Sequence, residues 1–282
     1  MAHVSTNDGV RLYFEEAGEG PPVLFVHEFG GDHRSWEPQL RALSRRYRCI
    51  VFSARGYPPS DVPQDEAAYS QARAVEDIVA VLDGLGWDTA YLMGHSWGGH
   101  LVFHAAVEIP ERLEGVLSVD PLGAVGDGGM EAFSAEMTAR VRKEDRARAR
   151  ELDDKDIAGE ATPEESREAF SLFWPSYFAD PASAPPLPRV EFCSPAMQGL
   201  FGDLTECLPK LEKSLPSIDV PFGVLVGELS PMPPTAGTDS AARIPGAWAH
   251  VQPGAGHFVW HESPGCLVAP MDRLVAESPA DP

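Results

Sequence analysis

A candidate nucleophile stands in a glycine-flanked turn, in the stretch Gly94-His95-Ser96-Trp97-Gly98. An apolar run over 90–93 precedes this turn, and a helical pattern over 99–107 follows it. A strand-to-helix turn that lifts a serine above a sheet leaves no space for a Cβ two residues before or after it, so glycine is required there. The pattern predicts Ser96 as the nucleophile, with the backbone N–H of Trp97 facing developing negative charge at the helix start.

A nucleophilic serine needs a base to take its proton, and a carboxylate to hold that base in the right tautomer. The stretch Gly254-Ala255-Gly256-His257-Phe258 follows the last predicted strand, and its small residues let the backbone bring a histidine over the strand ends. His257 is therefore the predicted base. Of the competing histidines, His95 points elsewhere on the turn, whereas His100 and His104 lie within the predicted helix.

The elements around these residues alternate between strand and helix. Short apolar or alternating runs predict strands over 9–17, 23–26, 49–52, 90–93, 115–119, 222–226 and 247–251. Helical spacing predicts helices over 36–43, 69–85, 99–107, 131–152 and 266–275, and a capping-box pattern starts another at Thr162. This order predicts an α/β fold with a mostly parallel sheet and helices on both faces.

The alternation stops between about residues 126 and 218, where the sequence is helical, charged and proline-rich without a buried strand. We therefore predict an α/β core formed by 1–125 and 216–282, with 126–215 inserted as a helical cap. Aromatic residues are dense over 170–178 and form either the cap's own small core or an apolar substrate pocket. The residues predicted for that pocket are His95, Phe133, Met137, Trp174, Tyr177 and Phe178, and Met197 is a further candidate.

The formal net charge of −21 repels nucleic acid and anionic membrane surfaces, so neither is an expected partner. No stretch approaches about 18 uncharged apolar residues, and no secretory signal is recognised, so we expect a cytoplasmic protein without a membrane span. The four cysteines match neither a metal spacing nor a disulfide framework. We expect no metal, no cofactor, a small-molecule substrate, and a monomer or homodimer.

Several motifs together resemble the α/β-hydrolase superfamily. They are the turn at Ser96, the loop 27–31, the segments 55–57 and 60–61, and Gly256-His257-Phe258. The resemblance extends from residue 9 to 275, with the cap at the usual insertion point. It implies an α/β-hydrolase fold and hydrolase activity without a cofactor, but it does not single out one substrate.

The first departure from this superfamily lies in the loop that supplies the oxyanion hole. The family commonly has His-Gly there, whereas this chain has His27-Glu28. A backbone donor survives a change of side chain, so the oxyanion donor is predicted to be the N–H of Phe29, with that of Glu28 as the alternative, paired with that of Trp97. The Glu28 side chain either faces the substrate entrance or is a solvated loop charge.

The second departure concerns the triad carboxylate, which most relatives carry after the penultimate strand. Here Ser230 occupies that place, and a hydroxyl cannot stabilise an imidazolium as a carboxylate does. Asp120 is the favoured acid, because it closes the strand after the nucleophile helix, a site that some α/β-hydrolases resembling the zearalenone-hydrolase type use. Its other interpretation is a turn cap before Pro121. Glu228 is the second candidate, and a chain without a working acid is the third.

These residues favour a serine hydrolase that cleaves a carboxylic ester or lactone of small to medium, apolar character through an acyl-enzyme. One alternative is an aminopeptidase resembling proline iminopeptidases, in which Glu28 or Glu228 holds a free amine. Another is a hydrolase fold that has lost catalysis and binds a ligand. The epoxide-hydrolase relatives use an aspartate where this chain has Ser96, so that chemistry is not expected.

Overall fold

The computed structural model describes residues 2–188 and 193–278, and within them eight strands form one sheet in the order β1-β2-β4-β3-β5-β6-β7-β8. The strands are β1 (Ala2–Ser5), β2 (Arg11–Ala17), β3 (Pro22–Val26), β4 (Arg48–Phe52), β5 (Ala90–His95), β6 (Leu113–Val119), β7 (Phe222–Gly227) and β8 (Trp248–Gln252). β1 and β2 pair antiparallel, and every pairing from β4 to β8 is parallel. The predicted α/β fold with a mostly parallel sheet is confirmed.

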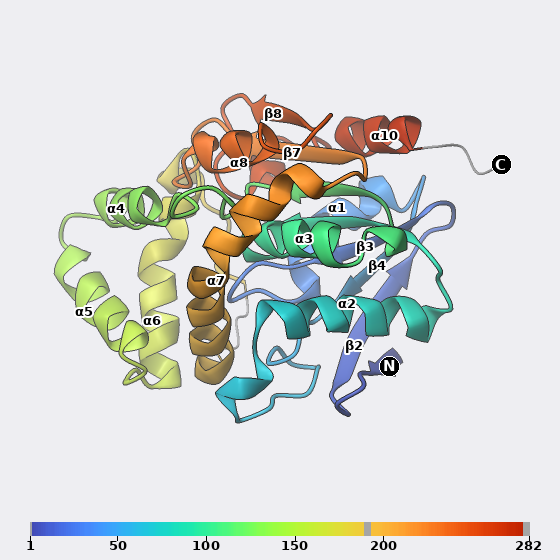
Figure 1. Ribbon diagram of the computed structural model, residues 1–282. Coiled ribbons are helices and arrows are strands. Elements are labelled where there is room, and N and C mark those ends of the chain that lie inside the picture. The colour runs from blue at the N-terminus through green and yellow to red at the C-terminus, as the bar shows by residue number, and fades with distance from the viewer. Residues whose placement is uncertain (1, 189–192, 279–282) are drawn as a thin grey trace.

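Helices cover both faces of this sheet. They are α1 (Glu37–Leu43), α2 (Gln71–Leu85), α3 (Trp97–Glu108), α8 (Pro234–Ala241), the single turn α9 (Val259–Glu262) and α10 (Val268–Glu277). Figure 1 shows α2 and α3 side by side in front of the strands, and the residues of α2, α3 and α8 share one core cluster. Along β3, Leu24 and Val26 point into that cluster, whereas Val23 and Phe25 point into a second one with α1 and α10. The strand is therefore apolar throughout because both of its faces are buried.

In the described part of the segment between β6 and β7 lie four α-helices: α4 (Met130–Arg140), α5 (Arg146–Ile157), α6 (Pro163–Phe173) and α7 (Ser194–Ser214). In Figure 1, α4, α5 and α6 stand together at the left, away from both chain ends. The capping box predicted at Thr162 is present, since its side chain accepts from the Glu165 N–H while the Glu165 carboxylate accepts from the Thr162 N–H. No strand occurs in the described part of 126–218, as the sequence predicts.

The prediction of one helix over 131–152 is wrong. The chain leaves the helical conformation at Val141, whose φ of −58° and ψ of 139° end α4, and α5 begins five residues later. Val141 is buried, and its carbonyl accepts from Arg146 Nε at 2.9 Å, which fixes the bend. Burial of one apolar residue thus overrides a stretch with good helix formers on both sides.

Among the α-helices and strands of the described residues, four further elements have no counterpart in the prediction, and one of them is the single turn α9. β1 is only four residues long with mostly exposed side chains, and α8 is short and rich in small residues. The long α7 contains Pro209, which normally breaks a helix because it lacks an N–H. Its apolar residues nevertheless recur at helical spacing and are buried against the α2 and α3 side of the core: Ala196, Leu200, Leu204, Leu208 and Leu211.

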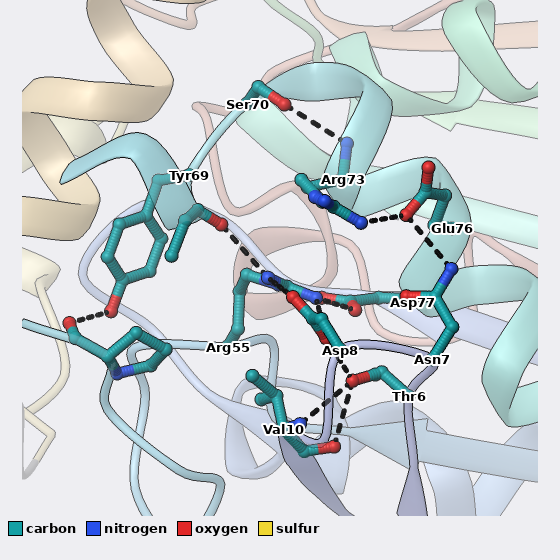
Figure 2. Close-up of polar contacts among 12 residues, drawn as sticks. Thr6, Asn7, Asp8, Val10, Arg55, Tyr69, Ser70, Arg73, Glu76 and Asp77 are labelled. Carbon is teal, nitrogen blue, oxygen red and sulfur yellow. Dashed lines mark hydrogen bonds and ion pairs between the residues drawn. The ribbon is translucent and has the colours of Figure 1, made fainter. Parts of the chain in front are cut away.

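A buried arginine ties the N-terminal hairpin to α2 and to the loop after β4 (Figure 2). The guanidinium of Arg55 binds both oxygens of Asp77, at 2.7 and 2.6 Å, and also contacts Asp8 at 2.9 Å. It donates in addition to the carbonyl of Ala68 at 2.9 Å. The side chains of Arg55 and Asp77 are each only 2% exposed. Arg55 therefore pairs with carboxylates from two segments, Asp8 in the turn between β1 and β2 and Asp77 on α2.

No helix within residues 2–188 and 193–278 has the length and apolar character that a membrane crossing requires. All four cysteines lie within these ranges and are unpaired.

Candidate active site

Ser96 sits at the apex of a strained turn between β5 and α3. Its φ of 56° and ψ of −115° lie in a region that residues with a Cβ rarely adopt. A Cβ on Gly94 would collide with the carbonyl of Gly98, and a Cβ on Gly98 would collide with the carbonyls at the end of β3. Both glycines are thus required by crowding. The Ser96 side chain remains partly exposed, as the predicted role of nucleophile requires.

The structure brings Asp120 and His257 together from positions 137 residues apart. His257 Nδ1 donates to Asp120 Oδ2 at 2.5 Å, and both side chains are almost fully buried. Asp120 follows β6 directly, and the backbone of Ser96 donates to the carbonyl of Val119 at 3.0 Å, so the nucleophile turn and the carboxylate share one strand end. Among the described residues, no hydrogen bond joins the Ser96 hydroxyl to His257. Catalytic hydrogen bonds are often long before substrate binds.

Ser230 holds the Asp120 carboxylate. Its hydroxyl donates to Asp120 Oδ2 at 2.5 Å and accepts from the backbone N–H of Met232 at 3.1 Å. The backbone N–H of Gly227 donates to the other oxygen, Oδ1, at 2.8 Å. Thus the serine found where relatives carry the acid still contacts the acid, and three donors surround the carboxylate.

Glu228 has a different partner. Its carboxylate accepts from the backbone N–H of Gly254 at 2.9 Å and bridges the ends of β7 and β8, whereas His257 Nδ1 faces Asp120. Of the two acids that the sequence offers, only Asp120 is within hydrogen-bond reach of His257 among the contacts of the described chain.

The loop 27–31, which is predicted to supply an oxyanion donor, is held in place by His27. Its Nδ1 donates to the Glu28 carbonyl at 2.7 Å, while its Nε2 accepts from the Ala54 N–H at 3.0 Å. Burial lowers the pKa of His27, and the nearby Glu28 only partly opposes this, so the imidazole stays neutral in this tautomer. The backbone N–H groups of Glu28, Phe29 and Trp97 have no acceptor in the described part of the chain. The Phe29 ring stacks on Trp97 at 5.1 Å, which keeps the two segments together.

The Glu28 side chain is neither a solvated charge nor a free anion at an entrance. It is 7% exposed, accepts from Ser35 Oγ at 2.6 Å and faces His95 Nδ1 at 3.3 Å. His95 is fully buried, and its other nitrogen donates to the backbone carbonyl of His257 at 3.0 Å. Both polar atoms of His95 are therefore occupied within the protein.

The aromatic residues predicted for a pocket divide into two groups. Trp174 and Phe178, which are 5% and 1% exposed, pack against Phe258 in the second core cluster. Tyr177, from the same 3₁₀ turn (Trp174–Tyr177), stacks on the His257 ring at 5.3 Å, and Phe133 of α4 lies 5.9 Å from that ring. Met137, on α4, is buried, and Met197 on α7 is half-buried. Of the residues predicted for the pocket, Tyr177, Phe133 and His95 are in ring contact with the candidate base, His95 at 4.6 Å.

The inserted segment is also hydrogen-bonded to the histidine loop. The His257 N–H donates to the Tyr177 carbonyl at 2.8 Å. The Glu262 carboxylate accepts from the Ala179 N–H at 2.7 Å and from the Gly256 N–H at 2.6 Å. Sequence reasoning missed Glu262 because its partner at 179 is 83 residues away and no motif marks the pair. It also missed the contacts of Glu28 and Ser230, although the unusual residue at each position was visible.

Comparison with known proteins places these features in a family. A family model for the alpha/beta hydrolase fold matches residues 21–264. An epoxide hydrolase from Caballeronia sordidicola is 36% identical over 117 residues, which cover 41% of this chain and 35% of that protein. Bifunctional epoxide hydrolase 2 from Sus scrofa is 37% identical over 119 residues, or 42% of this chain and 21% of that protein. The chain thus matches well under two thirds of the length of either relative.

Solved structures match over nearly the whole chain. An esterase from Thermogutta terrifontis is 26% identical with a TM-score of 0.67, and the match covers 98% of this chain and 97% of that one. Est816, described as an N-acyl homoserine lactone degrading enzyme, is 25% identical with a TM-score of 0.69, covering 96% of this chain and 99% of that one.

Proposed function

Because the chain belongs to the α/β-hydrolase fold family, we propose that it is a serine hydrolase that cleaves carboxylic esters or lactones of small to medium, apolar character. The observation that carries the proposal is the buried hydrogen bond of 2.5 Å between His257 and Asp120, beside the strained turn of Ser96. A base oriented by a carboxylate beside a partly exposed serine hydroxyl is the arrangement that acyl transfer requires.

The proposed mechanism proceeds in two halves. Ser96 Oγ attacks the substrate carbonyl while His257 Nε2 takes its proton, and Asp120 stabilises the imidazolium that forms. The N–H groups of Trp97 and Phe29, or of Glu28 in place of Phe29, bind the oxyanion, because they point at no protein acceptor in the described chain. His257 then protonates the leaving oxygen, and a water deprotonated by His257 releases the acid from Ser96.

The substrate class rests on the groups beside the base. Tyr177 and Phe133 place aromatic rings next to His257, and these suit an apolar acyl or alcohol group better than a charged one. Glu28 and Glu228 are engaged with His95 and Gly254, so neither offers a free carboxylate for the amine of an aminopeptidase substrate. The esterase and the lactone-degrading enzyme among the similar structures agree with this choice.

Epoxide hydrolysis fits this chain poorly, although the curated relatives carry that name. A carboxylate that opens an epoxide forms an ester, which water can hydrolyse. The Ser96 hydroxyl would form an ether, which has no carbonyl for water to attack, so the triad could not hydrolyse it and the diol would not be released. The stretches aligned with the epoxide hydrolases therefore support the fold family only. The type of reaction is inferred from the residue at the nucleophile position.

A fluorophosphonate probe tests the proposal, because it reacts with activated serines. We expect covalent labelling at Ser96, located by peptide mass spectrometry, and loss of labelling in Ser96→Ala. We also expect turnover of p-nitrophenyl butyrate and none of a prolyl arylamide. An unlabelled wild-type protein that turns over no ester or lactone would refute the proposal and favour a ligand-binding role.

The pH dependence of ester cleavage should show an acid limb with its midpoint below pH 6.5, the ordinary pKa of histidine. Burial lowers the pKa of His257, and the hydrogen bond to Asp120 raises it by less. The neutral base therefore persists to a lower pH than in a free imidazole, and kcat/KM falls only as the pH drops through this lowered value. A kcat/KM profile with its acid midpoint at or above 7 would contradict the expectation.

A further inference from the structure

The Glu28 side chain is buried and contacts Ser35 and His95. Its two carboxylate oxygens accept from Ser35 Oγ at 2.6 Å and face His95 Nδ1 at 3.3 Å. A Cβ on Gly31 would collide with this carboxylate, so the second glycine of the loop leaves the space in which Glu28 folds back. The Glu28 carboxylate is therefore held by specific contacts, although its backbone belongs to the loop proposed to supply the oxyanion donors.

The contacts of His95 require a hydrogen on Nε2 and a second hydrogen between Nδ1 and the Glu28 carboxylate. Its Nε2 faces the His257 carbonyl, which can only accept, so Nε2 carries a proton. Its Nδ1 faces a carboxylate oxygen of Glu28, and a neutral imidazole has no second N–H to offer. The pair must therefore hold one proton more than a neutral imidazole beside a carboxylate would.

The surroundings of Glu28 favour its ionised form, so our proposal assigns the extra proton of the pair to His95. Burial alone would raise the pKa of Glu28, but the hydrogen bonds from His95 and Ser35 and the charge on His95 outweigh it and leave the pKa of this carboxyl below its usual value. An ionised Glu28 and a doubly protonated His95 neutralise each other, which is the condition under which buried charges persist. The other titratable groups around the pair are His27, Tyr57, Tyr177, His257 and His261.

The pair also completes the fixation of the candidate base. The backbone N–H of His257 is held by the Tyr177 carbonyl at 2.8 Å, its carbonyl by His95 at 3.0 Å, and its ring by Asp120 at 2.5 Å. Removal of the His95 contact would leave the carbonyl side of His257 without a partner in the described chain. A rotation of this peptide would move the imidazole, whose position decides the rate.

We propose that Glu28 and His95 form a buried, charged bridge that couples the oxyanion loop to the His257 main chain and acts as a positioning pair for the base. The bridge gives a role to the residue that stands where relatives have glycine. This inference rests on the proposed hydrolase function for its kinetic consequence, but its protonation state is measurable without any turnover.

The test combines NMR with kinetics on two variants of Glu28. In wild-type protein labelled with ¹⁵N-histidine, with His95 assigned through His95→Gln, we expect protons on both His95 nitrogens at neutral pH. In Glu28→Gln the amide donates to Nδ1, so His95 keeps one proton and the bridge keeps its shape. Glu28→Ala breaks the bridge, and kcat for p-nitrophenyl butyrate is expected to fall about 10- to 100-fold with little change in KM.

Glu28→Gln should retain most of kcat, which a purely charge-based role would not allow. Glu37→Gln, which removes the same charge from an exposed position at the start of α1, is the matched control and should leave kcat unchanged. A singly protonated His95 in the wild type, or a Glu28→Ala variant within about twofold of wild-type kcat, overturns the proposal. If Glu28→Ala does not fold, the NMR comparison of wild type and Glu28→Gln still decides it. Failure of the hydrolase proposal is distinguishable from failure of this one. In that case the phosphonate would not label Ser96, while the NMR spectrum would still show protons on both His95 nitrogens.

Discussion

Replacement of Asp120 by Asn should lower kcat for p-nitrophenyl butyrate about 10³- to 10⁴-fold, with a smaller effect on KM. The carboxylate accepts from His257 Nδ1 and stabilises the imidazolium that forms when Ser96 attacks. An asparagine side chain has the same shape but no charge, and when its amide N–H faces Nδ1 it favours the wrong imidazole tautomer. The measurement is steady-state kinetics on a variant whose thermal unfolding matches the wild type.

A relocated carboxylate provides the sharper version of this experiment. Ser230 Oγ lies 2.5 Å from the same Asp120 oxygen that binds His257, so an aspartate at position 230 would begin close to the imidazole. We expect kcat of the double variant Asp120→Asn/Ser230→Asp to be at least about tenfold higher than kcat of Asp120→Asn alone. Glu228→Gln is the control, since its carboxylate binds Gly254. A loss in Glu228→Gln as large as that in Asp120→Asn would contradict the assignment of the acid.

Replacement of Arg55 by Met should lower the free energy of unfolding by about 3–5 kcal/mol. The methionine fills much of the space but leaves Asp77, whose side chain is 2% exposed, as an unpaired buried charge (Figure 2). It also leaves the Ala68 carbonyl and Asp8 without this donor. Urea denaturation, with the midpoint and slope compared, measures the change.

Two controls separate this effect from ordinary charge removal. Arg273→Met breaks an exposed pair with Glu277 and should cost less than about 1 kcal/mol. Adding Asp77→Leu to Arg55→Met removes both buried charges and should recover part of the loss, because most of the penalty comes from the unpaired carboxylate. A cost below about 1 kcal/mol for Arg55→Met alone would show that the ion pair in Figure 2 contributes little to stability.

The parts of the fold that the sequence predicts well are those with strong local signals. The runs at 23–26 and 90–93 are apolar throughout because both faces of β3 and β5 are buried, and both strands occur where predicted. The glycines around Ser96 mark a backbone that only glycine permits. Local signals were too weak for β1, and at Val141 they were overridden by burial of one side chain.

The contacts of the candidate site required the structure for a different reason. Asp120 and Ser230 are 110 residues apart, and His95 and His257 are 162 residues apart, so no spacing in the chain connects them. The sequence narrowed the acid to Asp120 or Glu228, because each ends a predicted strand. Only the three-dimensional path of the two loops determines which carboxylate meets the imidazole.

The hydrogen bonds between the segment that joins β6 to β7 and the loop around His257 limit how the protein can admit a substrate. Residues 177–179 are bonded to His257 and, through Glu262, to Gly256. A swing of α4, α5 and α6 away from the sheet would have to pivot about this point, and it would also have to break the hydrogen bond from Arg140 of α4 to the Leu229 carbonyl. A ligand that broke the hydrogen bonds at residues 177–179 would also move the His257 imidazole away from Ser96. Through this attachment, entry of an oversized molecule would displace the His257 imidazole from Ser96. The protein would then select against large substrates by losing its base, without any residue blocking the entrance.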